Sequence, residues 1–152
     1  MELTERMVSS QTIFEGKIIK VTLDQAQMPD GKLAAREVVY HPGGVAVLAL
    51  DEDMNVTLVR QHRIAAGRFT WEIPAGKLDS PKEDPFLAAQ RELEEETGLR
   101  AEKWQLLTCI DTTPGFCTER ISIYLATGLS QFNAHPDEDE FLHLTQMPLC
   151  EA

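Results

Sequence analysis

A single helix with its own start and stop signals, set among short strand-like runs, is the feature that most limits the possible folds. Asp84 followed by Pro85 is typical of a helix start, because the carboxylate can cap free N–H groups and proline suits the first helical position. Gly98 is the residue expected just past a helix end. One face of this helix is then lined by Phe86, Ala89, Leu93 and Thr97. We therefore expect one helix between residues 84 and 98.

Two hairpins are predicted ahead of this helix. Ile18–Met28 and Ala35–Tyr40 flank a turn that contains proline and glycine. Val45–Leu50 and Val56–Arg63 flank the polar residues 51–55 and are predicted to form a second hairpin with one buried strand. The first dozen residues are polar, and we expect them to be loosely held. Further short strands are expected at Thr70–Ile73, Trp104–Ile110, Ile121–Ala126 and Leu142–Leu144.

Hairpin spacing on both sides of a central helix, rather than strands alternating with helices, indicates an α+β fold with a mixed sheet and helical cover. The length of 152 residues is enough to bury a core without disulfides. We divide the chain into an N-terminal strand and hairpin region, residues 1–43, and a main domain, residues 44–152. Residues 148–152 read as the beginning of a helix, as they would in a chain truncated at its C-terminus.

Charge and composition exclude several classes of partner. Lys and Arg total 14 against 25 Asp and Glu, a net charge of 14 − 25 = −11, which disfavours non-specific binding to nucleic acid or an anionic membrane. The longest apolar run, Val45–Leu50, cannot cross a bilayer, and no secretory signal opens the chain. Three cysteines without CxxC spacing fit reduced thiols and give no support to a zinc site. We therefore expect a cytoplasmic protein.

The end of the predicted helix is unusually acidic. Glu92, Glu94, Glu95 and Glu96 crowd its last turns, where the helix dipole disfavours negative charge. Like-charge pairs at i,i+3 and i,i+4 cost about 1 kcal/mol together in an isolated helix. Three of these carboxylates, on a stripe placed opposite the apolar one, would suit a hard divalent cation. The alternative is a solvated acidic face, and Arg91 is either a surface residue or the cation that orients these acids.

Two segments around this helix resemble the Nudix box, whose pattern is G-x5-E-x7-R-E-U-x-E-E-x-G-U with U apolar. They are Gly76–Glu83 and Arg91–Leu99, and every fixed position from Glu83 to Leu99 matches. The departure is one extra residue, because six residues rather than five separate Gly76 from Glu83. The resemblance implies a Nudix-like α/β/α sandwich with a mixed sheet, preceded by an N-terminal β-hairpin subdomain.

Segments outside the box resemble the ADP-ribose pyrophosphatase branch of this family. Pro114 lies sixteen residues past Gly98, a spacing that is common in that branch. The other similar segments are Arg36–Val39, Arg60–Arg63, Trp71–Asp79, Thr113–Phe116 and Asp137–Phe141. The resemblance implies hydrolysis of the pyrophosphate bond of ADP-ribose or a related nucleoside diphosphate sugar, giving AMP and ribose 5-phosphate.

The resemblance also implies roles for individual residues. The metal, Mg²⁺ with Mn²⁺ as the alternative, would be held by Glu92, Glu95, Glu96 and the carbonyl oxygen of Ala75. The catalytic residues would be Arg91 and Glu95, with Glu138 or Glu140 as the general base. Those two glutamates lie in a run of four acids, which is otherwise a solvated loop.

Substrate would be bound by arginines on two segments. Arg60 and Arg63 are candidates for phosphate, Arg63 the stronger, although either could pair with a structural acid. By resemblance, Arg36 and Glu37 would hold the nucleoside end in the partner's site of a homodimer formed through residues 1–43. The four histidines and Cys117 are expected to be structural or exposed.

Two other functions remain open at this point. The chain could be a Nudix hydrolase for another nucleoside diphosphate derivative, or a non-catalytic Nudix domain that senses a nucleotide. Non-catalytic versions usually lose carboxylates of the box, whereas this sequence retains all of them.

Overall fold

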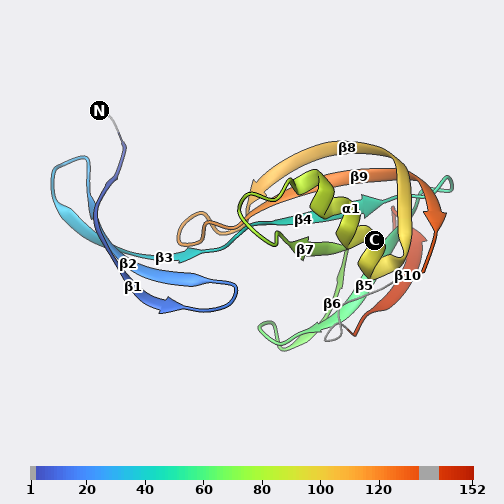
Figure 1. Cartoon of the computed structure of the whole chain (residues 1–152), viewed down its shortest axis with the longest axis horizontal. Coiled ribbons are helices and arrows are strands. Elements are labelled where there is room, and N and C mark those ends of the chain that lie inside the picture. Colours follow the sequence, from blue (N-terminus) through green and yellow to red (C-terminus); the bar gives the residue numbers. More distant parts are fainter. Residues whose placement is uncertain (1–2, 134–140) are drawn as a thin grey trace. The chain divides into compact units, whose positions relative to one another are not determined.

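The structure is a computed structural model that describes residues 3–133 and 141–152. The chain divides into two compact units. The first consists of Met1–Gly43 together with Asp111–Arg120, and the second of Gly44–Ile110 together with Ile121–Ala152. Each unit is described by itself below, with the element labels of Figure 1.

The first unit is built on a three-stranded antiparallel sheet in the order β1-β2-β3. Its strands are β1 (Arg6–Glu15), β2 (Lys20–Gln27) and β3 (Leu33–Tyr40). The turn between β2 and β3 is closed by the N–H of Met28 on the carbonyl of Lys32, with Gly31 at φ 85°. The first predicted hairpin is therefore confirmed.

The expectation of a loosely held N-terminus is wrong, because β1 spans ten residues and pairs with β2 along its length. Every residue of β1 is exposed, so the strand lacks the alternation of buried and exposed positions that marks a strand in a sequence. Its register also shifts twice, between Met7 and Ser9 and between Thr12 and Phe14. Pairing with β2, rather than burial of its own side chains, defines this strand.

Residues 111–120 join the first unit through the end of β3. The N–H of Val39 donates to the carbonyl of Phe116 at 2.7 Å, and the N–H of Thr118 donates to the carbonyl of Val39 at 2.9 Å. The hydroxyl of Thr118 also accepts the N–H of His41. A segment that lies between two strands of the second unit in sequence is therefore held by β3.

The second unit contains two sheets and one helix among the described residues (Figure 1). The mixed sheet has the order β7-β4-β9-β8, and the antiparallel sheet has the order β10-β5-β6. The strands are β4 (Gly44–Ala49), β5 (Asn55–Arg63), β6 (Arg68–Glu72), β7 (Ala75–Lys77), β8 (Leu99–Asp111), β9 (Arg120–Gln131) and β10 (His143–Pro148).

The second predicted hairpin is wrong in its pairing, although its turn is present. The N–H of Asp51 donates to the carbonyl of Asn55, and Leu50 and Val56 form one isolated bridge. Beyond that bridge β4 and β5 enter different sheets, and β4 pairs in parallel with β9 instead. A tight turn specifies that the chain reverses, but the partners of the two strands are set by side chains far away in sequence.

The helix α1 (Pro85–Thr97) begins and ends as predicted. The carboxylate of Asp84 accepts the N–H of Phe86 at 2.8 Å, and Gly98, at φ 69°, donates its N–H to the carbonyl of Glu94. The helix packs against β4 and β7. The larger hydrophobic cluster joins it to the mixed sheet through residues that include Val45, Val47, Ala88, Ala89, Leu93, Leu99, Tyr124 and Ala126.

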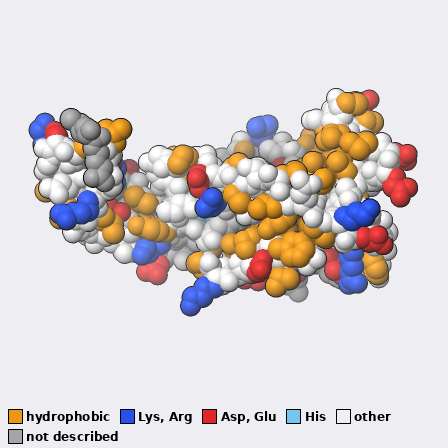
Figure 2. Space-filling view, turned by 90° about the horizontal axis from the view of Figure 1, so that it is seen from above, with side chains coloured by type: hydrophobic (Ala, Val, Ile, Leu, Met, Phe, Trp, Pro, Cys, Tyr) orange, Lys and Arg blue, Asp and Glu red, His pale blue; other side chains and the backbone are white. Residues whose placement is uncertain are grey.

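β8 is an edge strand of the mixed sheet and exposes several apolar side chains, among them Leu106 and Leu107. Figure 2 views the molecule from the side on which β8 lies in Figure 1, and hydrophobic side chains gather over that part of the surface. At the C-terminus, residues 149–151 form a turn, with the N–H of Glu151 on the carbonyl of Pro148. Within the described ranges, no helix is long and apolar enough to cross a membrane.

Candidate active site

Two of the helix carboxylates are buried rather than exposed. Glu92 is 8% exposed, and Glu96 is only 3% exposed. Both lie on the side of α1 that packs against the sheet, not on a stripe opposite Leu93 as the sequence analysis placed them. Burying a carboxylate is costly unless partners compensate it, so a merely solvated acidic face does not describe these two residues.

The compensating partners come from the short strand β7. The N–H of Ala75 donates to the Glu96 carboxylate at 3.1 Å. Gly76 leaves room for the carboxylate of Glu92, because a Cβ built on this glycine would collide with all three atoms of that group. The backbone of β7 is thus the surface against which both acids rest.

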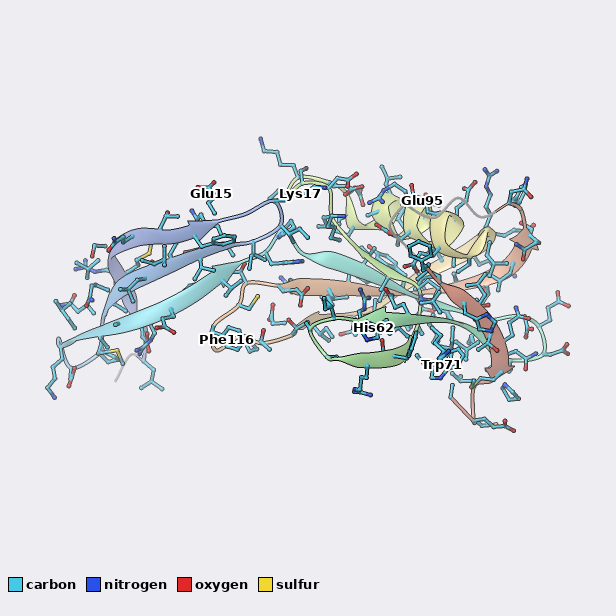
Figure 3. All side chains as sticks on the ribbon, turned by 90° about the horizontal axis from the view of Figure 1, so that it is seen from below. Glu15, Lys17, His62, Trp71, Glu95 and Phe116 are labelled. Atoms are coloured by element: carbon cyan, nitrogen blue, oxygen red, sulfur yellow. The ribbon has the colours of Figure 1, made fainter. Side chains whose placement is uncertain are left out.

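Arg91 lies among the remaining acids. Its Nη1 contacts Glu92 at 2.8 Å and Glu95 at 3.1 Å, and its Nη2 contacts Glu83 at 3.4 Å. Burial by itself would lower the pKa of Arg91, but the carboxylates of Glu92 and Glu95 outweigh it and raise that pKa above its ordinary value. The guanidinium therefore stays charged and holds the carboxylates of α1 in place, including Glu95, which Figure 3 labels.

Glu83 keeps its place despite the extra residue in the preceding loop. Its carboxylate accepts the N–H of Asp79 at 2.6 Å while its other oxygen faces Arg91. Between Asp79 and Glu83 the chain forms a turn, in which the N–H of Glu83 donates to the carbonyl of Ser80. With this loop, Glu83 faces Arg91.

The residues fit a hard divalent cation by their chemistry. Glu96 offers carboxylate oxygens beside the main chain of Ala75 and Glu92 beside Gly76, and such oxygens are what Mg²⁺ prefers. Across residues 3–133 and 141–152, no three His, Cys, Asp or Glu side chains are gathered as a metal centre. Arg91 bonds to oxygens of Glu92 and Glu95, and the N–H of Ala75 bonds to an oxygen of Glu96.

The two candidate phosphate-binding arginines have different partners. Arg63 makes a two-pronged contact with Glu72, with Nε at 3.0 Å and Nη2 at 2.6 Å from its oxygens. The hydrogen bonds from Arg63 lower the pKa of Glu72. Arg60 lies over the ring of Phe69 at 4.2 Å and that of Trp71 at 5.7 Å, with Trp71 labelled in Figure 3. Arg63 is therefore paired with Glu72 of β6, and Arg60 lies against the two aromatic rings of the same strand.

The remaining candidates lie in the first unit or outside the described residues. Arg36 pairs with Glu5 at 2.8 Å, and Glu37 is exposed on β3. The hydrogen bonds from Arg36 lower the pKa of Glu5. Glu138 and Glu140 fall within residues 134–140, which are outside the described ranges.

Comparison with known proteins assigns the chain to a family. Residues 40–152 match the family described as the NUDIX domain. The chain belongs to the Nudix hydrolase family. Residues 5–39 of this Nudix hydrolase match a second family, described as the nucleoside diphosphate sugar hydrolase N-terminal domain.

Several curated proteins are similar to this Nudix hydrolase over nearly its whole length. "ADP-ribose pyrophosphatase" of Mycobacterium tuberculosis is 45% identical, over 95% of this chain and 71% of the relative. "Methanol dehydrogenase activator" of Bacillus methanolicus is 42% identical, over 97% and 80%. "ADP-ribose pyrophosphatase" of Bacillus subtilis is 41% identical, over 99% and 82%.

A solved structure described as an ADP compounds hydrolase superposes with a TM-score of 0.84, covering 99% of this chain and 82% of the other at 21% identity. This likeness confirms the predicted Nudix fold with its mixed sheet and N-terminal strands. One helix, α1, is present in the described part of the chain, so a second helical layer is not among those residues.

Three contributions to the site of this Nudix hydrolase had no clear signal in its sequence. Glu72 holds Arg63, but the β5–β6 register places Glu72 opposite Val59 and Arg63 opposite Arg68, so strand pairing gave no signal for this contact. Gly76 was noted as part of the Nudix box, but its role in making room for Glu92 depends on how β7 packs. Glu83 was also part of the box, and its contact with Arg91 had no separate signal.

Proposed function

We propose that this Nudix hydrolase is a Mg²⁺-dependent ADP-ribose pyrophosphatase that releases AMP and ribose 5-phosphate. The observation that carries the proposal is the buried pair Glu92 and Glu96, both resting on β7 in a family that hydrolyses phosphoanhydrides. The names of two relatives at 45% and 41% identity support the substrate, as does the sugar hydrolase description of residues 5–39.

In the proposed reaction, the oxygen of a water molecule bonds to one phosphorus of the pyrophosphate as the bridging P–O bond breaks. The electron pair of that bond leaves with the departing phosphate, and the proton of the water passes to Glu138 or Glu140 as general base. Arg91 holds Glu92 and Glu95 in orientation throughout, since its guanidinium contacts both.

The carboxylates of Glu92, Glu95 and Glu96 and the carbonyl oxygen of Ala75 would hold Mg²⁺, with Mn²⁺ as the alternative ion. When bound, the metal would offset the negative charge of the phosphates and lower the pKa of the attacking water. Arg63 is assigned to a phosphate and Arg60 to a second contact at the substrate, and Glu72 fixes the guanidinium of Arg63.

The test is a hydrolysis panel of nucleoside diphosphate derivatives with and without Mg²⁺, with products identified by chromatography. We expect ADP-ribose to give AMP and ribose 5-phosphate, and activity to disappear in excess EDTA. Full turnover in EDTA would refute the metal mechanism. If another derivative is hydrolysed faster, that compound replaces ADP-ribose as the proposed substrate. The panel should be broad, because one relative is named for activating methanol dehydrogenase. No hydrolysis of any compound would favour a nucleotide sensor.

We predict that Gly76→Ala lowers kcat/KM for ADP-ribose by about tenfold or more. The new Cβ collides with the Glu92 carboxylate, so that side chain or β7 must move, and such overpacking costs about 1–3 kcal/mol of stability. The measurements are steady-state rates and thermal unfolding. The control is Lys77→Ala, which truncates an exposed side chain on the same strand. Parent-like rates and stability for Gly76→Ala would contradict the packing argument.

We also propose a homodimer formed through the first unit, with Arg36 and Glu37 completing the site of the other subunit. Neither hydrophobic cluster found among the described residues includes a residue of this unit, and β1 exposes Met7, Ile13 and Phe14. Such apolar surface favours burial against a second copy. We predict a dimer by light scattering, and a fully active monomer at the working concentration would remove this part of the proposal.

We further propose that the protein acts in the cytoplasm. Cys109, Cys117 and Cys150 are free thiols, which is the state expected in a reducing compartment. The net charge of −11 supports a small-molecule substrate and does not support nucleic acid or an anionic membrane as a partner.

A further inference from the structure

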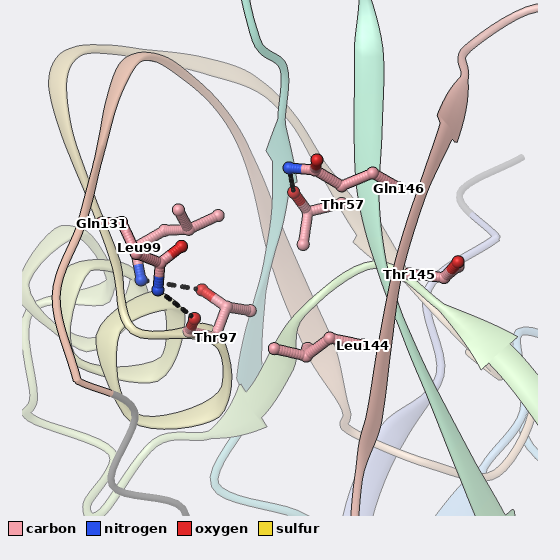
Figure 4. A pocket seen from close by; sticks show the side chains of 7 residues that line it. All are labelled: Thr57, Thr97, Leu99, Gln131, Leu144, Thr145 and Gln146. Atoms are coloured by element: carbon pink, nitrogen blue, oxygen red, sulfur yellow. Dashed lines mark hydrogen bonds between the residues drawn. The ribbon is translucent and has the colours of Figure 1, made fainter.

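A pocket of about 300 Å³ opens in the second unit beside the C-terminal end of α1 (Figure 4). It lies between two groups of residues. One group is at the end of α1, the start of β8 and the end of β9, and the other is on β5 and β10. Its lining consists of Thr57, Thr97, Leu99, Gln131, Leu144, Thr145 and Gln146. None of these residues has a role in the site described above.

The polar groups of the pocket are neutral and arranged in two pairs. On one side Gln146 donates from Nε2 to the hydroxyl of Thr57 at 3.3 Å, and on the other Gln131 donates from Nε2 to the carbonyl of Thr97 at 3.3 Å. The two threonines are buried, at 3% and 2% exposure, whereas the two glutamines are exposed. The Gln131 amide also faces the carbonyls of Gly98 and Phe132, and the Thr97 hydroxyl donates to the carbonyl of Leu93, so these two groups are engaged by the main chain. The Thr57 hydroxyl at the floor and the Gln146 amide at the rim are the pair that retains further hydrogen-bonding capacity.

This chemistry selects among the parts of a nucleotide sugar. A phosphate requires cationic or backbone donors, and no lining side chain is charged. A nucleobase favours an aromatic ring for stacking, and the apolar lining consists of Leu99 and Leu144. A sugar offers hydroxyls that both donate and accept, which matches threonine hydroxyls and glutamine amides. The volume lies at the lower end of small-molecule pockets and suits one sugar ring.

Two residues of the pocket, Leu144 and Thr97, lie close to residues of the candidate active site. Leu144 is paired with Val59, and Val59 is paired with Glu72, the residue that holds Arg63. Adjacent strands are about 4.8 Å apart, so Leu144 lies about 10 Å across the sheet from Glu72. On the helix side, Thr97 directly follows the buried Glu96. The sugar end of a substrate whose pyrophosphate is held beside Glu96 would therefore be within reach of the pocket.

We propose that this pocket binds the sugar end of the nucleoside diphosphate sugar, with Thr57 and Gln146 as the specificity-determining contacts. The inference rests on the proposed pyrophosphatase function, because it concerns the group attached to the distal phosphate of that substrate. ADP, which lacks the sugar, makes no use of the pocket.

The test compares binding of ADP-ribose and ADP to Thr57→Val and Gln146→Leu by calorimetry in EDTA, where no turnover is expected. Each variant removes polar groups with little change of shape, and Gln146 is exposed, so its variant should fold even if Thr57→Val does not. Loss of a hydrogen bond of this kind weakens binding about fivefold to tenfold. We expect that loss for ADP-ribose and a change under about twofold for ADP. Matched controls are Thr108→Val and Gln105→Leu, on the exposed part of β8.

Three results would overturn the inference: unchanged affinity of both variants for ADP-ribose, equal weakening for ADP-ribose and ADP, or the same loss in the β8 controls. Hydrolysis assays on the parent protein separate this failure from that of the proposed function. If the parent hydrolyses ADP-ribose and the variants bind it normally, the pocket assignment alone is wrong. If the parent does not hydrolyse ADP-ribose at all, the proposed function is wrong.

Discussion

Glu96→Gln is expected to lose at least about a hundredfold in the rate of ADP-ribose hydrolysis and to bind Mg²⁺ measurably more weakly. Glu96 is the most deeply buried acid of α1, and its carboxylate is positioned by the N–H of Ala75 beside the carbonyl assigned to the metal. Glutamine keeps an oxygen for that N–H but loses the negative charge that a divalent cation requires. Rates at saturating substrate and calorimetric metal titrations measure both effects.

The same substitution should leave the free energy of unfolding without metal unchanged or raised by a few tenths of a kcal/mol. It removes one of four crowded carboxylates near the negative end of the helix dipole. Metal affinity and stability without metal therefore move in opposite directions, which a generally damaged fold would not show. Glu94→Gln is the matched control, since Glu94 pairs with Arg100 and has no assigned metal role. If Glu96→Gln binds Mg²⁺ and turns over like the parent, the assignment of this helix is wrong.

The correct one of Glu138→Gln and Glu140→Gln should lower kcat by about a hundred- to ten-thousand-fold, with little change in KM or in metal affinity. A general base acts in the chemical step, so its loss should appear in kcat and should leave the ground-state complex intact. Stopped assays across the two variants, with Mg²⁺ titrations on each, identify the residue. Asp137→Asn and Asp139→Asn are controls from the same acidic run. Small rate effects in both glutamine variants would support a solvated loop in place of a catalytic one.

Local signals in the sequence predicted α1 well, because its limits depend on residues next to each other. Asp84 caps the first turn and Gly98 adopts the left-handed conformation that ends the last one, as their chemistry requires. The strand β1 lacked such a signal, since all its side chains are exposed and its register shifts twice. Its existence depends on pairing with β2, which the pattern of its own residues does not reveal.

Long-range pairing explains the other main difference between sequence and structure. The segment between Leu50 and Val56 carries a strong turn signal, and the turn forms. The strands on either side nevertheless join different sheets, because β4 finds its partners in β9 and β7. Alternating apolar residues predict that a strand is buried and leave its neighbours undetermined.

The candidate site shows the same difference between what local sequence predicts and what long-range packing decides. The spacing of Glu92, Glu95 and Glu96 on one helix could be read directly, and so could their suitability for a divalent cation. The burial of Glu92 and Glu96 could not, because it depends on the backbone of Ala75 and Gly76 lying against them. The neutral pocket at Thr57 and Thr97 had no signal either, since it joins a strand of one sheet to the end of the helix.

The membership of residues 111–120 in the first unit restricts how this protein can be recombined with its relatives. A cut after residue 43 would leave the carbonyl of Phe116 and the N–H of Thr118 without the Val39 groups that they bond. A chimera that exchanges the N-terminal unit is expected to pack best when residues 1–43 and 111–120 come from the same donor, because the two pieces form one unit and the Thr118 hydroxyl bonds to the N–H of His41. The unit is inherited in two pieces, and insertions or crossovers in either piece are constrained by the other.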